Sequence, residues 1–372
     1  MSSVPLTIKG FKSIAELSIT DENSPFIAFA GSNGAGKSNI TDALAFFGAV
    51  VKIGATQAIR DFGGFQHIHC YKLRGKNRAT AELRLVVTIS QQQFDYLLTI
   101  AEMDKKPVIT EQLSVNGAVV IERKQSDKVN IVLKPGAEFT KLPAYSSDMT
   151  ALMLLGESPF YQYITNIEVL RIEPLSAKKA NNSSADTTYL DTHGSNIASV
   201  LSTLEKDIEF KEQILDWMEL IVPGMESVST EKKKLDGATV LTFKEIGTAN
   251  PFPANLISDG TIYVLCIMTA ILSRASKPGM TIIEEPERGI HPKAIGELVQ
   301  LMRDTASLEH PIIITTHSES VVRNLEPKEL WLVSKNDGKT LLKHASDSGV
   351  DKKLIPLDTA WLTNLFDGGL PW

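Results

Sequence analysis

The sequence lacks several features that define whole classes of protein. Its 372 residues contain only two cysteines, Cys70 and Cys266, which lie far apart in the chain. Disulfide-stabilised folds depend on many cysteines, so we expect both thiols to be reduced and buried. No apolar run of about 18 or more residues is present, which argues against a membrane-spanning helix. The first residues carry neither the basic region nor the apolar stretch of a signal peptide, so we expect a cytoplasmic protein with no membrane partner.

Positive charge is also not in excess. The 38 Lys and Arg residues stand against 44 Asp and Glu, and the formal net charge is −6. This balance argues against binding nucleic acid over the whole surface but leaves a local basic groove open. A content of 43% hydrophobic and 22% charged residues is typical of a globular protein. The length exceeds one ordinary domain, so we expect a core that carries one inserted or appended lobe.

Periodicity divides the first half of the chain into two kinds of segment. We predict a first strand over Leu6–Ile14 and a second over Phe26–Ala30, which leads into a glycine-rich turn. A helix should follow, because apolar residues recur there at helical spacing. Its apolar face would comprise Ile40, Leu44, Phe47 and Val51. Alternating segments from Ala81 to Leu133 predict an antiparallel sheet against the core.

The second half changes character twice. From about residue 146 to residue 222 the pattern is helical, with one apolar stripe. That stripe would comprise Ile197, Leu201, Leu204, Ile208, Ile214, Leu215 and Met218. Beyond Ser258, helices at 262–272 and 292–302 alternate with strands at 280–283 and 311–315, which implies a parallel sheet flanked by helices.

One glycine-rich segment carries the strongest chemical signal. Its residues are Gly31, Ser32, Asn33, Gly34, Ala35, Gly36, Lys37 and Ser38, which fit GxxxxGK[ST] between a strand and a helix. Glycines let successive backbone N–H groups face phosphate oxygens, and the helix N-terminus adds partial positive charge. We expect Lys37 to reach the β- and γ-phosphates of ATP and the Ser38 hydroxyl to ligate Mg²⁺. A merely flexible turn is the alternative.

A second segment supplies acids. The apolar strand at 280–283 ends in Glu284 and Glu285, at the edge of a parallel sheet where the phosphate loop also lies. We expect Glu284 to hold Mg²⁺, directly or through water, and Glu285 to polarise the attacking water. Solvated carboxylates at an ordinary strand end are the alternative.

Two further segments complete the predicted site. His317 follows the apolar strand at 311–315 and is placed to contact the γ-phosphate, or else to cap the next helix. Ser258 precedes an apolar helix, and it forms a second anion-binding helix terminus together with the N–H groups that follow it. One nucleotide does not need two such termini from one subunit, so the second terminus should close on a partner's nucleotide.

Together these segments resemble the ABC-type ATPase domain of the RecF, SMC and overcoming-lysogenization-defect (OLD) groups. The resemblance rests on Phe11–Ile14, Gly31–Asn39, Leu256–Thr261, Ile283–Pro292 and Thr315–Ser318. It implies an α/β ATPase head with a mixed parallel sheet flanked by helices, an antiparallel β subdomain and an inserted helical lobe. We expect the N-terminal half of the head at 1–145, the lobe at 146–222 and the C-terminal half at 223–372.

The resemblance also implies roles for single residues. Glu285 becomes the general base, His317 the switch histidine, and Ser258 and Gly260 the signature residues that contact the nucleotide of a second head. Asn39 joins the loop residues as a nucleotide ligand. Two departures are that Glu284 replaces the usual Walker B aspartate, and that the signature reads Ser-Asp-Gly-Thr rather than the transporter form.

Function and partners follow from the same resemblance. We expect a Mg-dependent ATPase that forms a homodimer around two ATP molecules and acts on double-stranded DNA or on an effector, in genome maintenance or anti-phage defence. Lys37 and Ser258 are separated by only about 220 residues without heptads, so no long coiled-coil arms are expected. The chain ends about fifty residues after His317, so any TOPRIM-like nuclease should be a separate chain. An ATP-binding scaffold with little hydrolysis is the alternative, and a transporter ATPase is a third.

Weaker signals leave alternatives open. The basic run Lys72–Arg78, with Lys232–Lys234, could follow a phosphate backbone or form a solvated hairpin tip. Arg60 lies where SMC heads carry an arginine near nucleotide and DNA. Gln66 is a candidate for the glutamine that senses the γ-phosphate in this family. His291 could stabilise a dimer interface or simply begin a helix.

Overall fold

Three β-sheets organise the chain in the computed structural model, which describes residues 6–19, 24–125, 128–133, 136–142, 145–182 and 184–366. The outer limits of the predicted first and third parts, at residues 1 and 372, lie outside this range. Cys70 and Cys266 are buried and unpaired, as expected. None of the helices described is both long enough and apolar enough to span a membrane.

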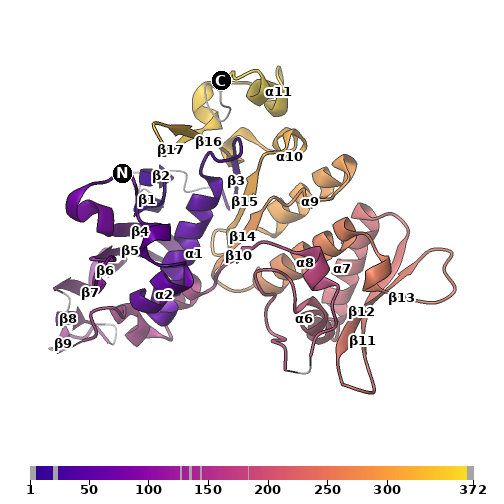
Figure 1. Ribbon diagram of the computed structural model, residues 1–372, viewed down its shortest axis with the longest axis horizontal. Coiled ribbons are helices and arrows are strands. Elements are labelled where there is room, and N and C mark those ends of the chain that lie inside the picture. Colours follow the sequence, from indigo (N-terminus) through magenta and orange to yellow (C-terminus); the bar gives the residue numbers. More distant parts are fainter. Residues whose placement is uncertain are drawn as a thin grey trace.

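The central sheet has six strands, in the order β10-β14-β15-β3-β16-β17 (Figure 1). Neighbouring strands are parallel except for the antiparallel pair β16 and β17, which confirms the predicted mixed parallel sheet. In chain order the strands are β3 (Phe26–Ala30), β10 (Ile167–Leu170), β14 (Met280–Glu284), β15 (Ile312–Thr316), β16 (Leu330–Asn336) and β17 (Lys339–His344).

Both faces of the middle of this sheet are buried, at β3, β14 and β15. Successive side chains of a strand point to opposite faces. In β15, Ile312 and Ile314 therefore join one hydrophobic core, whereas Ile313 joins the other. A strand covered on both faces reads as an unbroken apolar run, which is why β3, β14 and β15 were visible in the sequence.

An eight-stranded antiparallel sheet covers one side of the head. Its order is β2-β1-β4-β5-β6-β7-β8-β9, and it lies at the left of Figure 1. The strands are β1 (Leu6–Phe11), β2 (Ile14–Ile19), β4 (Ala81–Ile89), β5 (Gln92–Ala101), β6 (Val108–Val115), β7 (Ala118–Gln125), β8 (Lys128–Ile131) and β9 (Thr140–Leu142). The prediction of an antiparallel sheet between Ala81 and Leu133 is confirmed. The single strand predicted over Leu6–Ile14 is wrong, because Lys12 takes a φ of 49° and turns the chain into a hairpin.

Helices fill the layers between and around the sheets. Those of the head are α1 (Lys37–Ile53), α2 (Ala55–Asp61), α3 (Phe65–Ile68), α4 (Pro159–Thr165), α5 (Pro174–Ala177), α8 (Asp259–Arg274), α9 (Pro292–Thr305), α10 (Glu319–Arg323) and α11 (Leu357–Leu362). Short 3-10 turns occupy Gly75–Ala79, Ala151–Leu155, Ala254–Leu256, Pro327–Glu329 and Ala345–Ser348. Residues of α1 belong to the core beneath the eight-stranded sheet, and residues of α8 and α9 to the other core.

A lobe, which we define as residues 197–253, lies at the right of Figure 1. It contains α6 (Ile197–Leu204), α7 (Ile208–Ile221) and a three-stranded sheet of β11 (Met225–Lys232), β12 (Thr239–Glu245) and β13 (Phe252–Pro253). The helices α6 and α7 contact β11, and α7 also contacts α8 and α9. The boundaries predicted at 146 and 222 stay a prediction; within them, β10 belongs to the central sheet.

The apolar stripe predicted through α6 and α7 is interrupted. The first helix ends at Leu204, and Asp207 caps the second. The Asp207 carboxylate accepts hydrogen bonds from the N–H groups of Glu209 (3.0 Å) and Phe210 (3.4 Å). Ile208 is therefore 73% exposed and does not join the core, which corrects its predicted place. An Asp before a helix start is a common N-cap, so two separate helices replace one continuous stripe.

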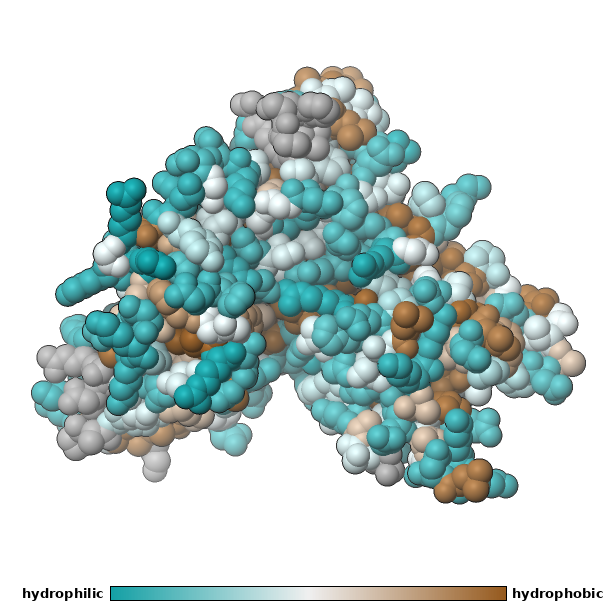
Figure 2. All heavy atoms as spheres, in the orientation of Figure 1, coloured by the Kyte–Doolittle hydropathy of each residue, from teal (hydrophilic) through white to brown (hydrophobic). Residues whose placement is uncertain are grey.

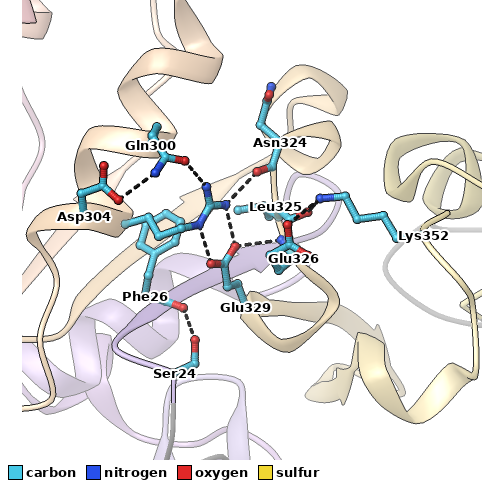
Figure 3. Close-up of polar contacts among 10 residues, drawn as sticks. Ser24, Phe26, Gln300, Asp304, Asn324, Leu325, Glu326, Glu329 and Lys352 are labelled. Carbon is cyan, nitrogen blue, oxygen red and sulfur yellow. Dashed lines mark hydrogen bonds and ion pairs between the residues drawn. The ribbon is translucent and has the colours of Figure 1, made fainter.

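The C-terminal segment is held to the head by a polar cluster (Figure 3). Buried Glu329 accepts two hydrogen bonds from Arg303 of α9, at 2.6 Å and 2.8 Å. The Lys352 amine donates to the Leu325 carbonyl at 2.7 Å and to a Glu326 carboxylate oxygen at 2.9 Å. Two-pronged arginine–carboxylate pairs are among the strongest polar contacts in proteins. This cluster therefore fixes the segment that leads to α11, which forms one wall of the site described next.

Candidate active site

The glycine-rich loop lies between β3 and α1, as predicted. Gly36 takes a φ of 110°, and a Cβ placed on it would lie 2.0 Å from the Thr340 hydroxyl oxygen. A Cβ on Gly31 would lie 2.3 Å from the Val333 carbonyl oxygen. Both positions therefore require glycine for space. Gly36 is also the N-cap of α1 and has no side chain to cap it, so the first N–H groups of the helix remain available to an anion.

Lys37 is buried and folds back over this loop. Its Nζ donates hydrogen bonds to the carbonyl oxygens of Gly31 (2.7 Å) and Ser32 (3.1 Å). Burial lowers the pKa of the Lys37 amine, and the charges of Glu285, Glu287 and Glu284 partly oppose that effect. A cation placed at this point is positioned to neutralise phosphate oxygens.

The remaining predicted loop residues differ in their contacts. Asn33 is exposed at the tip of the loop, while Ala35 is buried and its N–H bonds to the Ser32 carbonyl. Asn39 donates from its side-chain amide to the Ser13 hydroxyl at 2.5 Å, and Ser13 in turn bonds Thr340 at 2.6 Å. Asn39 thus supports the base of the loop, and its role as a nucleotide ligand stays a prediction.

Glu284 lies at the end of β14, beside α1. Its Oε1 accepts hydrogen bonds from the Thr41 hydroxyl at 2.6 Å and from Arg171 Nη2 at 2.9 Å. Burial alone disfavours the charged guanidinium, but the bond to Glu284 and the charge of Asp42 outweigh it and raise the pKa of Arg171. Thr41, Asp42 and Arg171 were not identified from the sequence. One sequence feature could have identified Arg171. It directly follows a short apolar strand, β10, just as Glu284 and Glu285 lie at the end of β14.

The oxygen donors present fit magnesium. The exposed Ser38 hydroxyl lies in the first turn of α1, and the Thr41 hydroxyl that bonds Glu284 also bonds the Ser38 carbonyl at 3.1 Å. Mg²⁺ prefers oxygen ligands and commonly takes one or two from protein while phosphates and water supply the rest. Within the described residues, no group of three or more His, Cys, Asp and Glu side chains could hold a metal alone. A metal held by Ser38 and Glu284 would take its other ligands from phosphates and water.

Glu285 and His317 meet across the carboxyl edge of the sheet. His317 Nδ1 lies 3.0 Å from Glu285 Oε1. Glu285 takes an unusual φ of 52°, which its N–H bond to the Thr315 carbonyl (2.8 Å) helps to hold. Tyr263 Oη lies 3.0 Å from the Glu285 carbonyl oxygen and 2.9 Å from that of Glu284. Left-handed conformations of bulky residues cluster at functional sites, because only a rigid surrounding can maintain them.

These side chains open onto one cavity of about 700 Å³. Its wall comes from the glycine-rich loop, the segment after β14, the start of α10 and the end of α11. The lining residues are Gly31, Ser32, Glu285, Glu287, Arg288, His317, Ser318, Glu319, Ser320, Trp361 and Leu362. The structure thus brings Glu285 and His317 together with the loop, and Lys37 and Glu284 lie alongside.

The sequence reasoning missed Glu287, a second acid in this cavity. Its Oε1 accepts a hydrogen bond from the Thr316 hydroxyl at 2.7 Å and lies 4.0 Å from His317 Nδ1. Its Oε2 is buried without a hydrogen-bond partner among the described residues. Burial raises the pKa of the Glu287 carboxyl, and the bond from Thr316 partly offsets this.

This raised pKa predicts a pH-dependent stability. A carboxyl whose folded pKa is raised stabilises the fold fully below its unfolded pKa of about 4.3, and that stabilisation is lost as the pH rises through the folded pKa. Glu287→Gln removes the ionisation. We expect its melting temperature to exceed that of the wild type by about 2 °C near pH 8, and the two to converge near pH 4.

Melting curves across this pH range provide the measurement. Glu212→Gln, at an exposed position of α7, should show no pH-dependent difference from the wild type and serves as the control. A melting temperature for Glu287→Gln that stays below the wild type at every pH would contradict the assigned ionisation.

The predicted signature residues lie at the start of α8. Ser258 is its N-cap and accepts a hydrogen bond from the Thr261 N–H at 3.0 Å. Gly260 contacts the loop that follows the acids, since a Cβ placed on it would lie 2.1 Å from the Gly289 carbonyl oxygen. Ser258 is exposed, as a residue that contacts a second subunit must be. Its contact with a nucleotide stays a prediction.

Two weaker candidates are also located. Gln66 is exposed in α3, and its backbone carbonyl accepts a hydrogen bond from Tyr71 Oη at 2.9 Å. The side chain that contacts Glu284 is that of Arg171 rather than Gln66, and no sequence pattern assigned Arg171 to the site. His291 is the N-cap of α9, where its Nδ1 accepts from the Lys293 N–H at 3.3 Å. Its observed contact therefore agrees with the simpler reading, the start of a helix.

Comparison with known proteins also indicates an ATPase domain. Residues 26–323 match the family described as "AAA domain, putative AbiEii toxin, Type IV TA system". A protein of Methanosarcina acetivorans named "Putative ABC transporter ATP-binding protein" is 26% identical over 139 residues, which are 37% of this chain and 47% of that protein. The matched part thus spans about half the length of that relative.

Solved structures with similar folds are heads of SMC proteins. A crystal structure of the SmcHead bound to the C-winged helix domain of ScpA has a TM-score of 0.60 at 15% identity, covering 92% of this chain and 98% of that one. An Smc head domain with an extended coiled coil, bound to the C-terminal domain of ScpA derived from Pyrococcus furiosus, has a TM-score of 0.53 at 13% identity, with coverages of 94% and 98%. These similarities establish the fold of an ABC-type ATPase head.

Proposed function

Because this chain belongs to the AAA-domain family described above and is a P-loop ABC-type ATPase of the RecF/SMC group, we propose that it hydrolyses Mg·ATP between two copies of itself. One observation carries the proposal. Glu285 and His317 lie 3.0 Å apart at the sheet edge, in the cavity that the glycine-rich loop also lines. A base placed next to a phosphate-binding loop is the arrangement that hydrolysis of a phosphoanhydride requires.

Each residue then has a defined task. The N–H groups of residues 32–38 and the Lys37 cation bind the phosphates, and Ser38 and Glu284 would hold the metal. The metal would supply charge neutralisation at the β- and γ-phosphates. Glu285 accepts a proton from the attacking water, and His317 orients that carboxylate. Ser258 and Gly260 of a second copy complete the site on the γ-phosphate side.

We assign the energy of this cycle to work on double-stranded DNA or on a separately encoded effector, in genome maintenance or anti-phage defence. Two observations support a protein partner. The SMC heads of similar fold were solved with ScpA domains bound. In addition, apolar areas lie on the surface of the lobe (Figure 2), and large exposed side chains there include Ile208, Leu235 and Ile246. These side chains lie on different elements of the lobe, and a partner protein that covered them would bury apolar surface.

Mass and turnover test this proposal together. Light scattering should show a dimer in the presence of Mg·ATP and a monomer without it. Turnover should depend on Mg²⁺ and rise on addition of double-stranded DNA or of the partner. A constant mass, with no Mg-dependent turnover, would contradict hydrolysis of ATP between two copies of the chain and would favour an ATP-binding scaffold instead.

The basic run at 72–78 supports the DNA part of the proposal. Lys72, Arg74, Lys76 and Arg78 are exposed, and the exposed ring of Tyr71 adjoins them. Lys72 Nζ lies 3.4 Å from an Asp337 carboxylate oxygen, so the run borders the β16–β17 hairpin. Nucleic-acid-binding surfaces combine basic side chains with aromatic rings. This combination therefore favours nucleic-acid binding over the alternative, a solvated turn.

Neutral variants test this surface. We expect Lys72→Gln combined with Arg74→Gln to reduce the slope of log K against log salt for DNA binding by about 2, one per lost phosphate contact. ATP turnover without DNA should not change. Fluorescence anisotropy of labelled duplex DNA at several salt concentrations provides the slope. Lys105→Gln with Lys106→Gln, at exposed positions between β5 and β6, is the matched control. An equal effect there would assign the change in slope to net charge and not to the 72–78 surface.

A further inference from the structure

Arg171 connects three parts of the molecule at one point. It follows Leu170, the last residue of β10, whose register partner in the neighbouring parallel strand is Ile283. Arg171 and Glu284 therefore leave the same sheet edge side by side. Arg171 Nη2 donates to Glu284 Oε1 at 2.9 Å and also pairs with an oxygen of Asp42 in α1.

A second ion pair fixes this arrangement from the opposite side. The other oxygen of Asp42 accepts a hydrogen bond from Lys12 Nζ, 2.5 Å away, in the turn between β1 and β2. The side chains of Asp42 and Glu284 are only 13% and 16% exposed. Two cations thus balance two partly buried carboxylates. Partly buried charges need such pairing, and removing one partner leaves its neighbour uncompensated.

The backbone of Arg171 is held by the segment that leads into the lobe. Its N–H donates to the Thr192 carbonyl at 2.7 Å, and its carbonyl lies 3.1 Å from His193 Nδ1. The first helix of the lobe, α6, begins at Ile197, four residues after His193. A single residue therefore contacts the Glu284 carboxylate through its side chain and the entrance to the lobe through its main chain.

We propose that Arg171 is a positioning residue, which orients the Glu284 carboxylate for turnover of the metal–nucleotide complex and transmits the state of that carboxylate to the lobe. This inference rests on the proposed function, because it takes Glu284 as the metal ligand. Hydrogen bonds to a ligating carboxylate fix its orientation and typically change metal affinity or activity by about 10- to 100-fold when lost.

The same contacts explain how the transmission works. A divalent cation on Glu284 would repel the neighbouring guanidinium and shift its pairing toward Asp42, which Arg171 already contacts. We expect this shift of the side chain to weaken the backbone bonds of Arg171 to Thr192 and His193. Coupling of this kind needs an element with two discrete states that both sites influence.

Two variants of Arg171 distinguish a positioning role from a purely structural one. We expect Arg171→Ala to lower kcat by about 10- to 100-fold. The Mg²⁺ concentration for half-maximal binding of a fluorescent ATP analogue should not rise, because a repelling cation has been removed. Arg171→Lys keeps the charge and should recover part of kcat. The protection from hydrogen exchange that Mg·ATP confers on residues 191–204 in the wild type should be absent in Arg171→Ala.

Arg84→Ala is the matched control. It breaks an exposed pair with Asp95 on the eight-stranded sheet and should leave all three readouts within about twofold of the wild type. The inference is overturned if Arg171→Ala matches this control, or if it raises the Mg²⁺ midpoint and lowers kcat equally in both Arg171 variants. A wild type that binds Mg·ATP without turnover would contradict the proposed function alone, since the Mg²⁺ midpoint and hydrogen exchange would still decide the role of Arg171.

Discussion

Glu285→Gln is expected to lose ATP turnover while retaining a stable dimer around Mg·ATP. Glutamine has the same shape, so the contacts of the 284–291 segment should persist, but its amide cannot accept the proton of the attacking water. General-base catalysis contributes about 10²- to 10⁴-fold, and we expect a loss in that range. The nucleotide ligands Lys37, Ser38 and Glu284 remain, so binding continues. The uncleaved nucleotide then keeps the two heads together.

Light scattering and phosphate release measure both outcomes. The mass should change from 40.7 kDa for the monomer to twice that value with Mg·ATP, and should stay there for the variant long after the wild type has reverted. Glu212→Gln, on the exposed surface of α7, should behave like the wild type. Turnover that survives in Glu285→Gln would assign the base elsewhere. Loss of turnover with full biological activity would favour the ATP-binding scaffold.

Gly260→Ala is expected to disrupt the signature loop more than its one added methyl group suggests. The new Cβ would lie 2.1 Å from the carbonyl oxygen of Gly289 and 3.0 Å from its carbonyl carbon, and neither backbone atom is the end of a flexible side chain. Either the start of α8 or the loop after Glu285 must move. Forcing an extra carbon into a closely packed position typically costs about 1–3 kcal/mol of stability. We also expect the nucleotide-dependent dimer to be lost.

Gly156→Ala provides a control of the same chemistry. Gly156 has a φ of −55°, and its nearest neighbour to an added Cβ is a backbone oxygen 3.7 Å away, so alanine fits there without movement. Chemical denaturation gives the change in unfolding free energy, and nucleotide binding to the monomer is measured separately. Since Lys37 and the glycine-rich loop are untouched, monomer binding should persist. A Gly260→Ala protein with normal stability and a normal dimer would show that the loops around Gly260 adjust freely.

Part of the site could be predicted because its residues are contiguous in the chain. The loop at 31–38 and the acids at 284 and 285 follow buried strands whose apolar runs are visible without coordinates. The end of a parallel strand is a position that local sequence specifies, and several such ends share one sheet edge. The sequence therefore predicted that these segments lie at one sheet edge, but it did not predict the distances between their side chains.

The supporting residues could not be predicted in the same way. Thr41 and Asp42 read as ordinary helix positions, and Arg171 lies 113 residues from the Glu284 that it contacts. Glu287 belongs to the recognised segment, yet only its burial beside Thr316 distinguishes it from a solvated acid. Trp361 joins the cavity because the Arg303–Glu329 pair and Lys352 hold the C-terminal segment against the head.

By itself, then, the sequence determined the phosphate-binding loop, the acids and histidine at the sheet edge, the parallel core and the antiparallel sheet. Each of these depends on interactions between residues close in the chain, or on a simple period of two or 3.6. Tertiary structure alone decided the bridge from Asp42 through Arg171 to Glu284 and the burial of Glu287 beside Thr316. Those features arise where segments far apart in the chain must satisfy one another's charges, and no local pattern records which distant partner will meet that need.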